Sequence, residues 1–245
     1  MKLLLTLALL PLITHADYSA YEVDNKSTHE TSKVKMISGK KESNRFYQGN
    51  LSKVFPTSIE NVLKGILNFS EKCNNELKDR RELTDKKAVC AHHNSNLVES
   101  KVYKITKEFK KKKNETDRFL VARRIYNRQS FSHIDLITRY EEKNSSGNRV
   151  IKISQEMISD TEVKKYIDPP VELDSAFQKA YAEFTVTEID KESTIVSYYY
   201  ASETDHWLLN KSVSVGQVFD SMGKSIGLLF SSIDAGSKPK MISKN

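Results

Sequence analysis

The sequence is poor in the residues and motifs that usually identify a catalytic or metal site. It contains two cysteines, one tryptophan, eight glycines and five prolines in 245 residues. A phosphate-binding glycine loop, a paired Cys-x-x-Cys and a His-Glu-x-x-His are all missing. We therefore expect no metal, no cofactor and no catalytic residue that a motif identifies. A cyclase or dehydratase with a loosely patterned site stays open.

Long apolar runs are also missing, apart from one short run at the N-terminus. Lys2 is followed by an apolar stretch from Leu3 to Ile13 and then by Thr14-His15-Ala16, which fits a secretory signal cleaved after Ala16. A membrane anchor needs about 18 to 20 apolar residues, and a polar segment begins here at Asp17. We expect a secreted or periplasmic protein.

The two cysteines, Cys73 and Cys90, are predicted to form one disulfide bond in an oxidising compartment. Closing a loop of this size adds about 3 kcal/mol of stability when the bond is unstrained. The alternative is a metal site made with His92 and His93. That arrangement lacks the paired spacing of a zinc motif.

The formal net charge is +7, and Lys110, Lys111, Lys112 and Lys113 form a run between two strand-like segments. Such a run is most often a solvated turn that discourages strand pairing. It can also rest on an anionic membrane surface, where each lysine adds about 1 kcal/mol. An exported chain without a stripe of aromatic and basic residues is not expected to bind nucleic acid.

The N-terminal part beyond the signal has almost no apolar periodicity. Residues 17–44 are predicted to be a disordered polar arm, with order beginning near Arg45. Phe46 to Val54 is expected to be a short strand that ends at Pro56. Thr57-Ser58-Ile59-Glu60 has the form of a capping box, after which helical spacing continues to Phe69.

After Cys90 the pattern becomes strand-like. Strands are expected where β-branched and aromatic residues are frequent, at Val102 to Phe109, Phe119 to Asn127, Phe131 to Tyr140, Val150 to Ile158, Ala180 to Ile189 and Thr194 to Ser202. Thr161 to Phe177 is interpreted as a loop with a helical turn. The short connections predict an antiparallel meander with one face to be covered.

An amphipathic helix is predicted from Val213 to Ile233, with Met222 and Ile226 on its apolar stripe. Gly216, Gly223 and Gly227 lie along one edge of this stripe. Each glycine costs a helix interior about 1 kcal/mol. Their common edge indicates a surface that approaches the helix backbone very closely.

Three segments resemble the START-like, or helix-grip (SRPBCC), superfamily of lipid and small-molecule binding domains. They are Phe55 to Leu63, Asp117-Arg118-Phe119-Leu120-Val121, and the hairpin, loop and helix from Ala182 to Ile233. The resemblance implies an α+β fold in residues 45–236, in which a curved antiparallel sheet of about six or seven strands grips a long C-terminal helix. Residues 237–245 are then expected to be a flexible tail.

The resemblance implies a hydrophobic ligand, such as a lipid, held between the sheet and the C-terminal helix. Arg123 lies among apolar neighbours, so its charge needs a carboxylate or a ligand head group as partner; the interpretation we favour instead puts it on a solvent face. His133 and Asp135 share a face and can act as an acid–base pair, although paired polar residues more often mark the wet side of a strand.

The remaining candidate ligand contacts come from the last strand, the loop and the helix. They are Tyr198 and Tyr200, whose strand carries tyrosines on both faces, Trp207 in the loop that would act as a lid, and Met222 and Ile226. For Trp207, packing inside the protein is the more ordinary role.

Three functions follow from these features. The first is an exported protein that binds a hydrophobic ligand. The second is a secreted interaction or adhesion module in which side chains fill the cavity. The third is an enzyme of cyclase or hydrolase type in which Arg123, His133 and Asp135 converge on the cavity.

Overall fold

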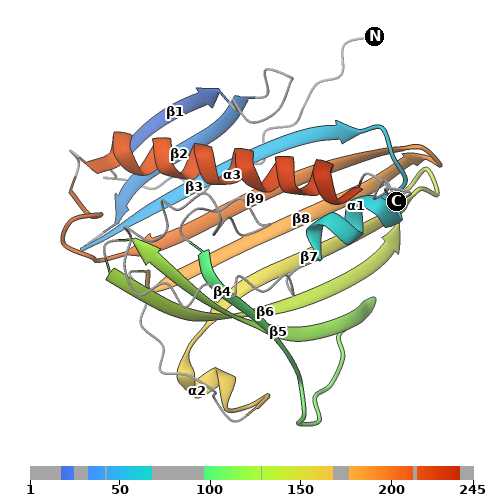
Figure 1. Cartoon of the computed structure of the whole chain (residues 1–245), viewed down its shortest axis with the longest axis horizontal. Helices are drawn as coiled ribbons and strands as arrows, with labels where there is room; N and C mark the ends of the chain where they lie inside the picture. Colours follow the sequence, from blue (N-terminus) through green and yellow to red (C-terminus); the bar gives the residue numbers. More distant parts are fainter. Residues whose placement is uncertain are drawn as a thin grey trace, which may run out of the picture.

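A single antiparallel sheet organises the chain (Figure 1). The computed structural model describes residues 18–24, 33–41, 43–67, 97–127, 129–167, 177–211 and 214–237. The strands are β1 (Tyr18–Asp24), β2 (Lys33–Lys41), β3 (Asn44–Phe55), β4 (Leu97–Lys104), β5 (Glu115–Asn127), β6 (Gln129–Lys143), β7 (Arg149–Ile158), β8 (Lys179–Asp190) and β9 (Ser193–Thr204); the helices are α1 (Ile59–Ile66), α2 (Asp160–Val163) and α3 (Val215–Ser237).

The nine strands pair in the order β1-β2-β3-β9-β8-β7-β6-β5-β4. Every pair is antiparallel. Only the β3–β9 pairing joins strands distant in sequence, and it closes the N-terminal part of the chain onto the C-terminal part. The predicted antiparallel sheet is confirmed, but it has nine strands among the described residues, not six or seven.

The additional strands come from the segment that we expected to be a disordered arm. That prediction is wrong for Tyr18–Asp24 and Lys33–Lys41, which are β1 and β2. In β2 the side chains of Val34 and Met36 are buried, whereas Lys35 between them is exposed. The strand alternation is therefore present, but frequent lysines mask it in the sequence, as is common in strands near a sheet edge.

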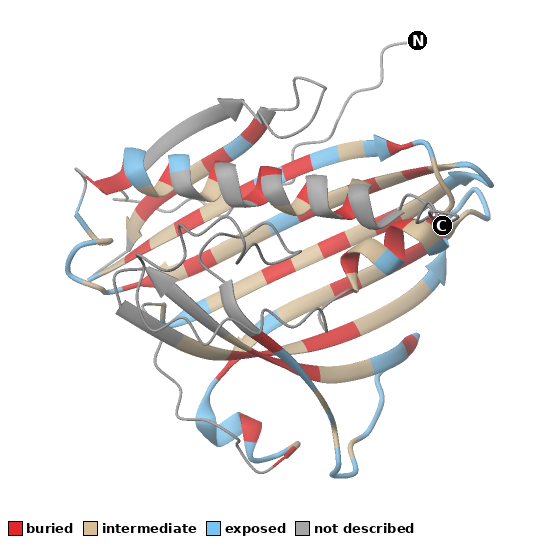
Figure 2. Cartoon of the chain, in the orientation of Figure 1, coloured by how far each residue is buried: buried red, intermediate tan, exposed pale blue. Residues whose placement is uncertain are grey.

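The main core lies on the sheet face that carries α1 and α3, which we call the inner face (Figures 1 and 2). Phe219, Phe230 and Ile233 of α3 are almost fully buried there. Phe230 packs against Phe55 and Tyr198, with ring centroids 6.1 and 6.3 Å apart. Burial of such aromatic side chains supplies much of the apolar stabilisation of a domain.

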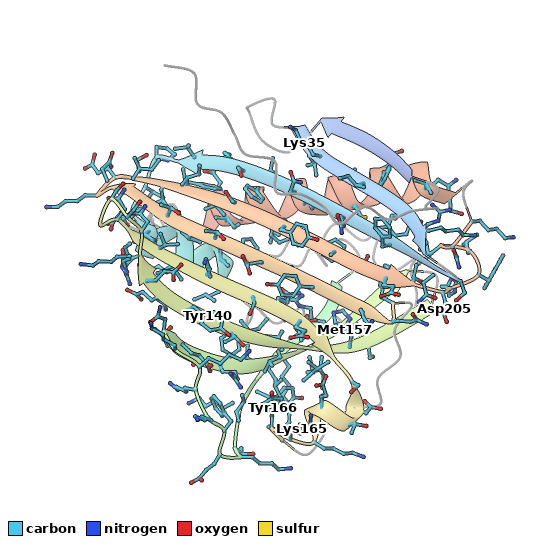
Figure 3. All side chains as sticks on the ribbon, turned by 180° about the vertical axis from the view of Figure 1, so that it is seen from behind. Lys35, Tyr140, Met157, Lys165, Tyr166 and Asp205 are labelled. Carbon is cyan, nitrogen blue, oxygen red and sulfur yellow. The ribbon has the colours of Figure 1, made fainter. Side chains whose placement is uncertain are left out.

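A smaller core covers the opposite, outer face of β5, β6 and β7 near α2. It contains Leu120, Ala122, Ile134, Ile158, Val163 and Ile167. In Figure 3, Lys165 and Tyr166 follow α2 on this side of the sheet. The carbonyl of Tyr166 accepts hydrogen bonds from the backbone of Thr106 and Lys107. The segment after α2 is thereby fastened to the loop that follows β4.

Helix α1 begins as the sequence predicts, but without the capping box. Ser58 is the N-cap residue, and its side chain makes no capping hydrogen bond. The carboxylate of Glu60 instead forms an ion pair with Arg149 of β7, and Arg149 also binds Glu141 at 2.6 Å. Glu60 therefore joins α1 to the sheet and is not available to close the cap.

The close approach to α3 occurs at glycines outside the helix. A Cβ atom on Gly65 of α1 would lie 2.8 Å from the carbonyl oxygen of Ile233, and one on Gly49 of β3 would lie 3.0 Å from Ile226 Cδ1. At Gly216 no atom lies within 4 Å of that position, so the expected close packing is wrong there. Gly223 and Gly227 are both buried.

Several sequence predictions fall outside the described residues. They are the signal segment, Cys73 and Cys90 with their disulfide, the alternative metal ligands His92 and His93, and residues 238–245. Within the described ranges, no helix combines the length and apolar character needed to cross a bilayer, and no three acidic, histidine or cysteine side chains are grouped as a metal site.

Candidate functional site

A cluster of polar side chains lies on the inner face where β5, β6 and β7 meet. Val121 pairs with Asp135 across β5 and β6, and Arg123 pairs with His133. Paired residues of antiparallel strands point to the same face. Because Val121 belongs to the main core, Arg123, His133 and Asp135 share the face that α1 and α3 cover.

Asp135 is the centre of this cluster. Its Oδ2 atom lies 3.0 Å from Arg123 Nη1 and 3.4 Å from His133 Nε2, and it accepts a hydrogen bond of 3.1 Å from Gln155 Nε2. The side chain of Asp135 is 3% exposed, against 18% for Arg123 and 17% for His133. The Asp135 carboxylate is therefore buried, whereas its partners Arg123 and His133 stay partly exposed.

Both favoured interpretations of these residues are wrong. We expected Arg123 on a solvent face and His133 with Asp135 on the wet side of a strand. The structure brings all three together in a largely apolar environment. A single strand's alternation does not reveal which of its two faces is buried, and here the face with the charged residues is the core face.

The cluster is electrostatically self-compensated. Burial alone would raise the pKa of the Asp135 carboxyl, but Arg123, His133 and the hydrogen bond from Gln155 outweigh it and hold that pKa below its usual range. Asp135 is thus ionised at neutral pH and balances the charge of Arg123. A balanced pair of this kind can offer hydrogen bonds to a neutral polar group without requiring an anion.

Two tyrosines on β9 extend the cluster toward the centre of the sheet. Tyr198 pairs with Phe184 and Tyr200 pairs with Ala182, and Ala182 in turn pairs with Gln155. Burial is the main cause that raises the pKa of both hydroxyls. Each tyrosine therefore stays protonated at neutral pH and can donate a hydrogen bond.

The predicted helix residues Met222 and Ile226 lie on α3 above β3. Ile226 is 4% exposed, and Met222 packs against the main core. Both are close to Gly49, where a Cβ atom would approach Met222 Cε to 3.7 Å. These two side chains are engaged in packing between α3 and β3, several strands away from Arg123 in the sheet order.

Trp207 lies apart from the other candidates. Its side chain is 67% exposed in the loop between β9 and α3, so the expectation that it packs inside the protein is wrong. Lys211 Nζ lies 4.9 Å from its ring centroid. The sequence analysis predicted that this loop would act as a lid, but no pattern in the sequence indicates that the side chain of Trp207 points into solvent.

Two features of the chain were not predicted from the sequence. Gln155 is central to the cluster, and its only signal is that it alternates with Ile151 and Ile153 on β7. The spacing Gly-x-Ser-x-Gly also occurs, at Gly223 to Gly227, within α3. A nucleophile elbow needs a sharp turn between a strand and a helix, so this motif does not form one.

The lysine run occupies the connection between β4 and β5, as predicted. Lys110, Lys111, Lys112 and Lys113 are all exposed. The loop is fastened at its base, where Glu115 accepts a hydrogen bond of 2.9 Å from the backbone of Lys112 and forms an ion pair of 2.6 Å with Arg118. The lysines are thus displayed on an ordered turn.

No family model and no curated protein matched the sequence. Among solved structures, the STAR-related lipid transfer protein fragment from Xanthomonas axonopodis is 13% identical, with 90% of this chain and 99% of that chain covered and a TM-score of 0.44. The human StarD13 lipid transfer and protein localization domain is 9% identical, with 90% of each chain covered and a TM-score of 0.45.

Human STARD10 is also similar, at 11% identity and a TM-score of 0.41 over 84% of this chain and 72% of that chain. These values do not by themselves assign a function to this chain. The antiparallel sheet described above, with α1 and α3 covering its inner face, agrees with the fold that the sequence predicts.

Proposed function

We propose that this protein is exported and binds a hydrophobic ligand, such as a lipid, on the inner face of its sheet. The observation that supports this proposal is the polar cluster of Arg123, His133, Asp135 and Gln155, set into an otherwise apolar face. Sites for small molecules are typically apolar surfaces with a few placed polar groups. Apolar contacts would supply the affinity, at about 25 cal/mol per Å², and the cluster would orient the head of the ligand.

The packing beneath α3 favours a position for the ligand over β5, β6, β7 and β8. Near β3, Tyr47 and Phe219 form an edge-on pair with centroids 6.1 Å apart, and Ile226 reaches Gly49. Side chains thus fill the space near Met222 and Ile226, where the sequence predicted that a ligand would lie between the C-terminal helix and the sheet. Arg123, Tyr198 and Tyr200 remain the ligand contacts of this proposal.

The balanced charge of the cluster favours a neutral polar head group. Arg123 is already paired with Asp135 at 3.0 Å, and the raised pKa values of Tyr198 and Tyr200 keep their hydroxyls neutral. A hydroxyl or carbonyl oxygen of the ligand could accept a hydrogen bond from Arg123 or a tyrosine, and a hydroxyl could also donate one to His133. A fully ionised phosphate would leave excess negative charge beside Asp135.

Native mass spectrometry of the gently purified protein tests the proposal, with uptake from lipid vesicles as a second measurement. We expect bound lipid, and we expect Tyr200→Phe to weaken its retention about fivefold, which corresponds to one hydrogen bond of about 1 kcal/mol. Tyr199→Phe is the matched control, because Tyr199 is the adjacent tyrosine on the outer face and is 37% exposed.

An unloaded protein that also takes up no lipid would contradict ligand binding. It would favour the second hypothesis, an interaction or adhesion module with a filled interior, which the aromatic packing of Phe55, Tyr198 and Phe230 supports locally. If Tyr199→Phe and Tyr200→Phe change lipid retention equally, Tyr200 makes no hydrogen bond to the ligand.

The third hypothesis, an enzyme on this fold, is favoured by one contact. His133 Nε2 lies 3.4 Å from the buried carboxylate of Asp135, an arrangement that can orient a general base. The same mass spectrometry distinguishes the two functions. A carrier releases its ligand at unchanged mass, whereas an enzyme converts it, and His133→Gln abolishes the conversion.

Docking of Lys110 to Lys113 on an anionic membrane stays a prediction. It is supported by the exposure of all four lysines on a fastened turn. Replacing the four by glutamine would test it in a vesicle sedimentation assay at low and high salt, since contact through lysines alone weakens as salt screens the charges.

A further inference from the structure

Trp207 and Leu208 form an exposed apolar tip on the loop between β9 and α3. Their exposed fractions are 67% and 41%, and they are adjacent in sequence. The other large exposed apolar side chains among the described residues, Val54, Val102, Ile189 and Tyr199, lie singly on strands. The loop begins after β9 near Asp205, which Figure 3 labels at one end of the sheet.

The base of this loop is fixed to the sheet. The hydroxyl of Tyr47 donates a hydrogen bond of 2.6 Å to the carbonyl of Leu209, and Arg45 Nε donates one of 3.1 Å to the carbonyl of Asn210. Tyr47 and Arg45 are themselves 0% and 1% exposed. The backbone also closes on itself through Asn210 N and the carbonyl of His206 at 2.9 Å. An anchored base holds the tip outward, so its exposure is a built feature of the fold.

The charged side chains named around the tip, Lys211, Lys40, Lys179, Glu203 and Asp205, leave a small positive excess. Lys211 stands beside the indole ring, and Lys40 lies at the end of β2, paired in register with Arg45. Lys179 and Glu203 form an ion pair of 3.4 Å nearby, and they compensate each other. Asp205 offsets one lysine, and the whole chain carries a net charge of +7.

The small size of the tip decides which partner fits it. A stable protein interface needs about 800 Å² from each partner, which two side chains do not provide. A lipid bilayer requires only a few inserted apolar groups. Tryptophan is enriched at the level of the lipid head groups, and neighbouring lysines attract anionic lipids.

We propose that Trp207 and Leu208 insert into the interface of an anionic lipid bilayer, with Lys211 at the level of the head groups. Docking in this way places the start of α3 and the adjacent ends of β3 and β9 against the membrane. The inference goes beyond the proposed function, because it depends on the loop and not on whether the inner face holds a ligand. It is also separate from Lys110 to Lys113, which lie in the connection between β4 and β5.

The tryptophan itself provides the test, because it is the only one in the chain. Vesicles of phosphatidylcholine with about 30% phosphatidylserine are added to the full mature protein, a composition chosen for its negative surface potential. We expect a blue shift of tryptophan emission, quenching by lipids brominated near the head of the acyl chain, and protection from acrylamide. Pure phosphatidylcholine should give a smaller response.

Sedimentation with the same vesicles gives the effect of each residue. Trp207→Ala should weaken binding about tenfold or more, the loss expected for one large apolar side chain. Ile189→Ala is the matched control, since Ile189 is 48% exposed on β8 at the β8–β9 turn, the opposite end of that hairpin. Lys211→Gln should weaken binding at low salt, whereas Lys191→Gln in the β8–β9 turn should not.

Unchanged tryptophan emission in the presence of bound vesicles would overturn the proposal and leave docking to another surface. Absence of vesicle binding, or equal losses for Trp207→Ala and Ile189→Ala, would also overturn it. Ligand binding is measured separately in the absence of vesicles, so failure of the tip and failure of the inner-face site give different results.

Discussion

At the scale of single residues, the arrangement around Asp135 is the least ordinary feature of the protein. Its carboxylate is 3% exposed and has three polar partners on three neighbouring strands. Removing one member of a buried ion pair leaves an uncompensated charge, which typically costs about 3 to 5 kcal/mol. A substitution at Asp135 that removes its negative charge therefore leaves Arg123 without the carboxylate that balances its charge.

Asp135→Asn is expected to lower the free energy of unfolding by about 3 kcal/mol at pH 7, as measured by urea denaturation. The pKa of Asp135 in the folded state is lowered, so its contribution is complete above the unfolded pKa of about 3.9 and is lost as pH falls through the folded value. The stability difference between the native protein and the variant should therefore shrink below about pH 4.

The matched control is Asp190→Asn, because Asp190 is an exposed carboxylate in the β8–β9 turn that accepts a 2.8 Å hydrogen bond from the backbone of Glu192. We expect a change within about 1 kcal/mol there, as for an exposed turn residue. A difference between native protein and Asp135→Asn that stays constant down to pH 2 would mean that Asp135 is not stabilised by charge pairing.

At the scale of elements, the crossing of α1 and α3 depends on one glycine. Gly65 faces the backbone of Ile233, where an added Cβ atom would lie 2.8 Å from the carbonyl oxygen and 2.9 Å from Cα. Backbone atoms cannot move aside as a flexible side chain can. The two helices must therefore separate if any larger residue occupies this position.

Gly65→Ala is expected to destabilise the protein by about 1 to 3 kcal/mol, the usual cost of overpacking, although alanine favours a helix by about 1 kcal/mol. Gly216→Ala is the control with the opposite sign. It lies in α3 with open space around it, so it should be neutral or stabilising by up to about 1 kcal/mol. Thermal denaturation followed by circular dichroism compares the two, and a stabilising Gly65→Ala would contradict the close crossing.

The sequence predicted the later strands well and the helix contacts poorly. The expected strands Phe131 to Tyr140 and Val150 to Ile158 lie within β6 and β7. They could be predicted because β-branched and aromatic residues recur along both segments. Gly65 gave no signal, since a glycine inside a helical pattern does not reveal what lies opposite it. The capping box failed because Glu60 has a stronger partner in Arg149, which is distant in sequence.

At the scale of the whole molecule, β1 and β2 extend the sheet beyond the expected domain. Figure 1 shows α3 lying along β1, β2 and β3, and α3 contacts all three strands. Val34 and Met36 of β2 belong to the same core as Phe219 and Phe230. The N-terminal strands therefore take part in holding α3 against the sheet.

Met36→Ala should lower the free energy of unfolding by about 2 to 4 kcal/mol, because the side chain is 1% exposed and its loss leaves a cavity. Lys35→Ala, on the exposed side of the same strand, should change it by less than about 0.5 kcal/mol. Chemical denaturation measures both. Equal, small effects would indicate that the segment is an unstructured arm, as its composition alone predicted.

The candidate site was only partly accessible from the sequence. Arg123, His133 and Asp135 were selected by spacing on their strands, but their convergence depends on the register of β5 with β6. Gln155 joins them through the register of β6 with β7, where it pairs with Ile137. Pairing registers are set by contacts across the whole sheet, and local patterns do not contain them.

The outward position of Trp207 has a spectroscopic consequence. Tryptophan emission usually reports the unfolding of a core, because the indole moves from an apolar interior into water. Here the only tryptophan is 67% exposed before unfolding begins, whereas tyrosines such as Tyr47 and Tyr198 are buried. The tyrosines and the far-ultraviolet signal of the sheet report folding, and the tryptophan signal is left free to report events at the surface.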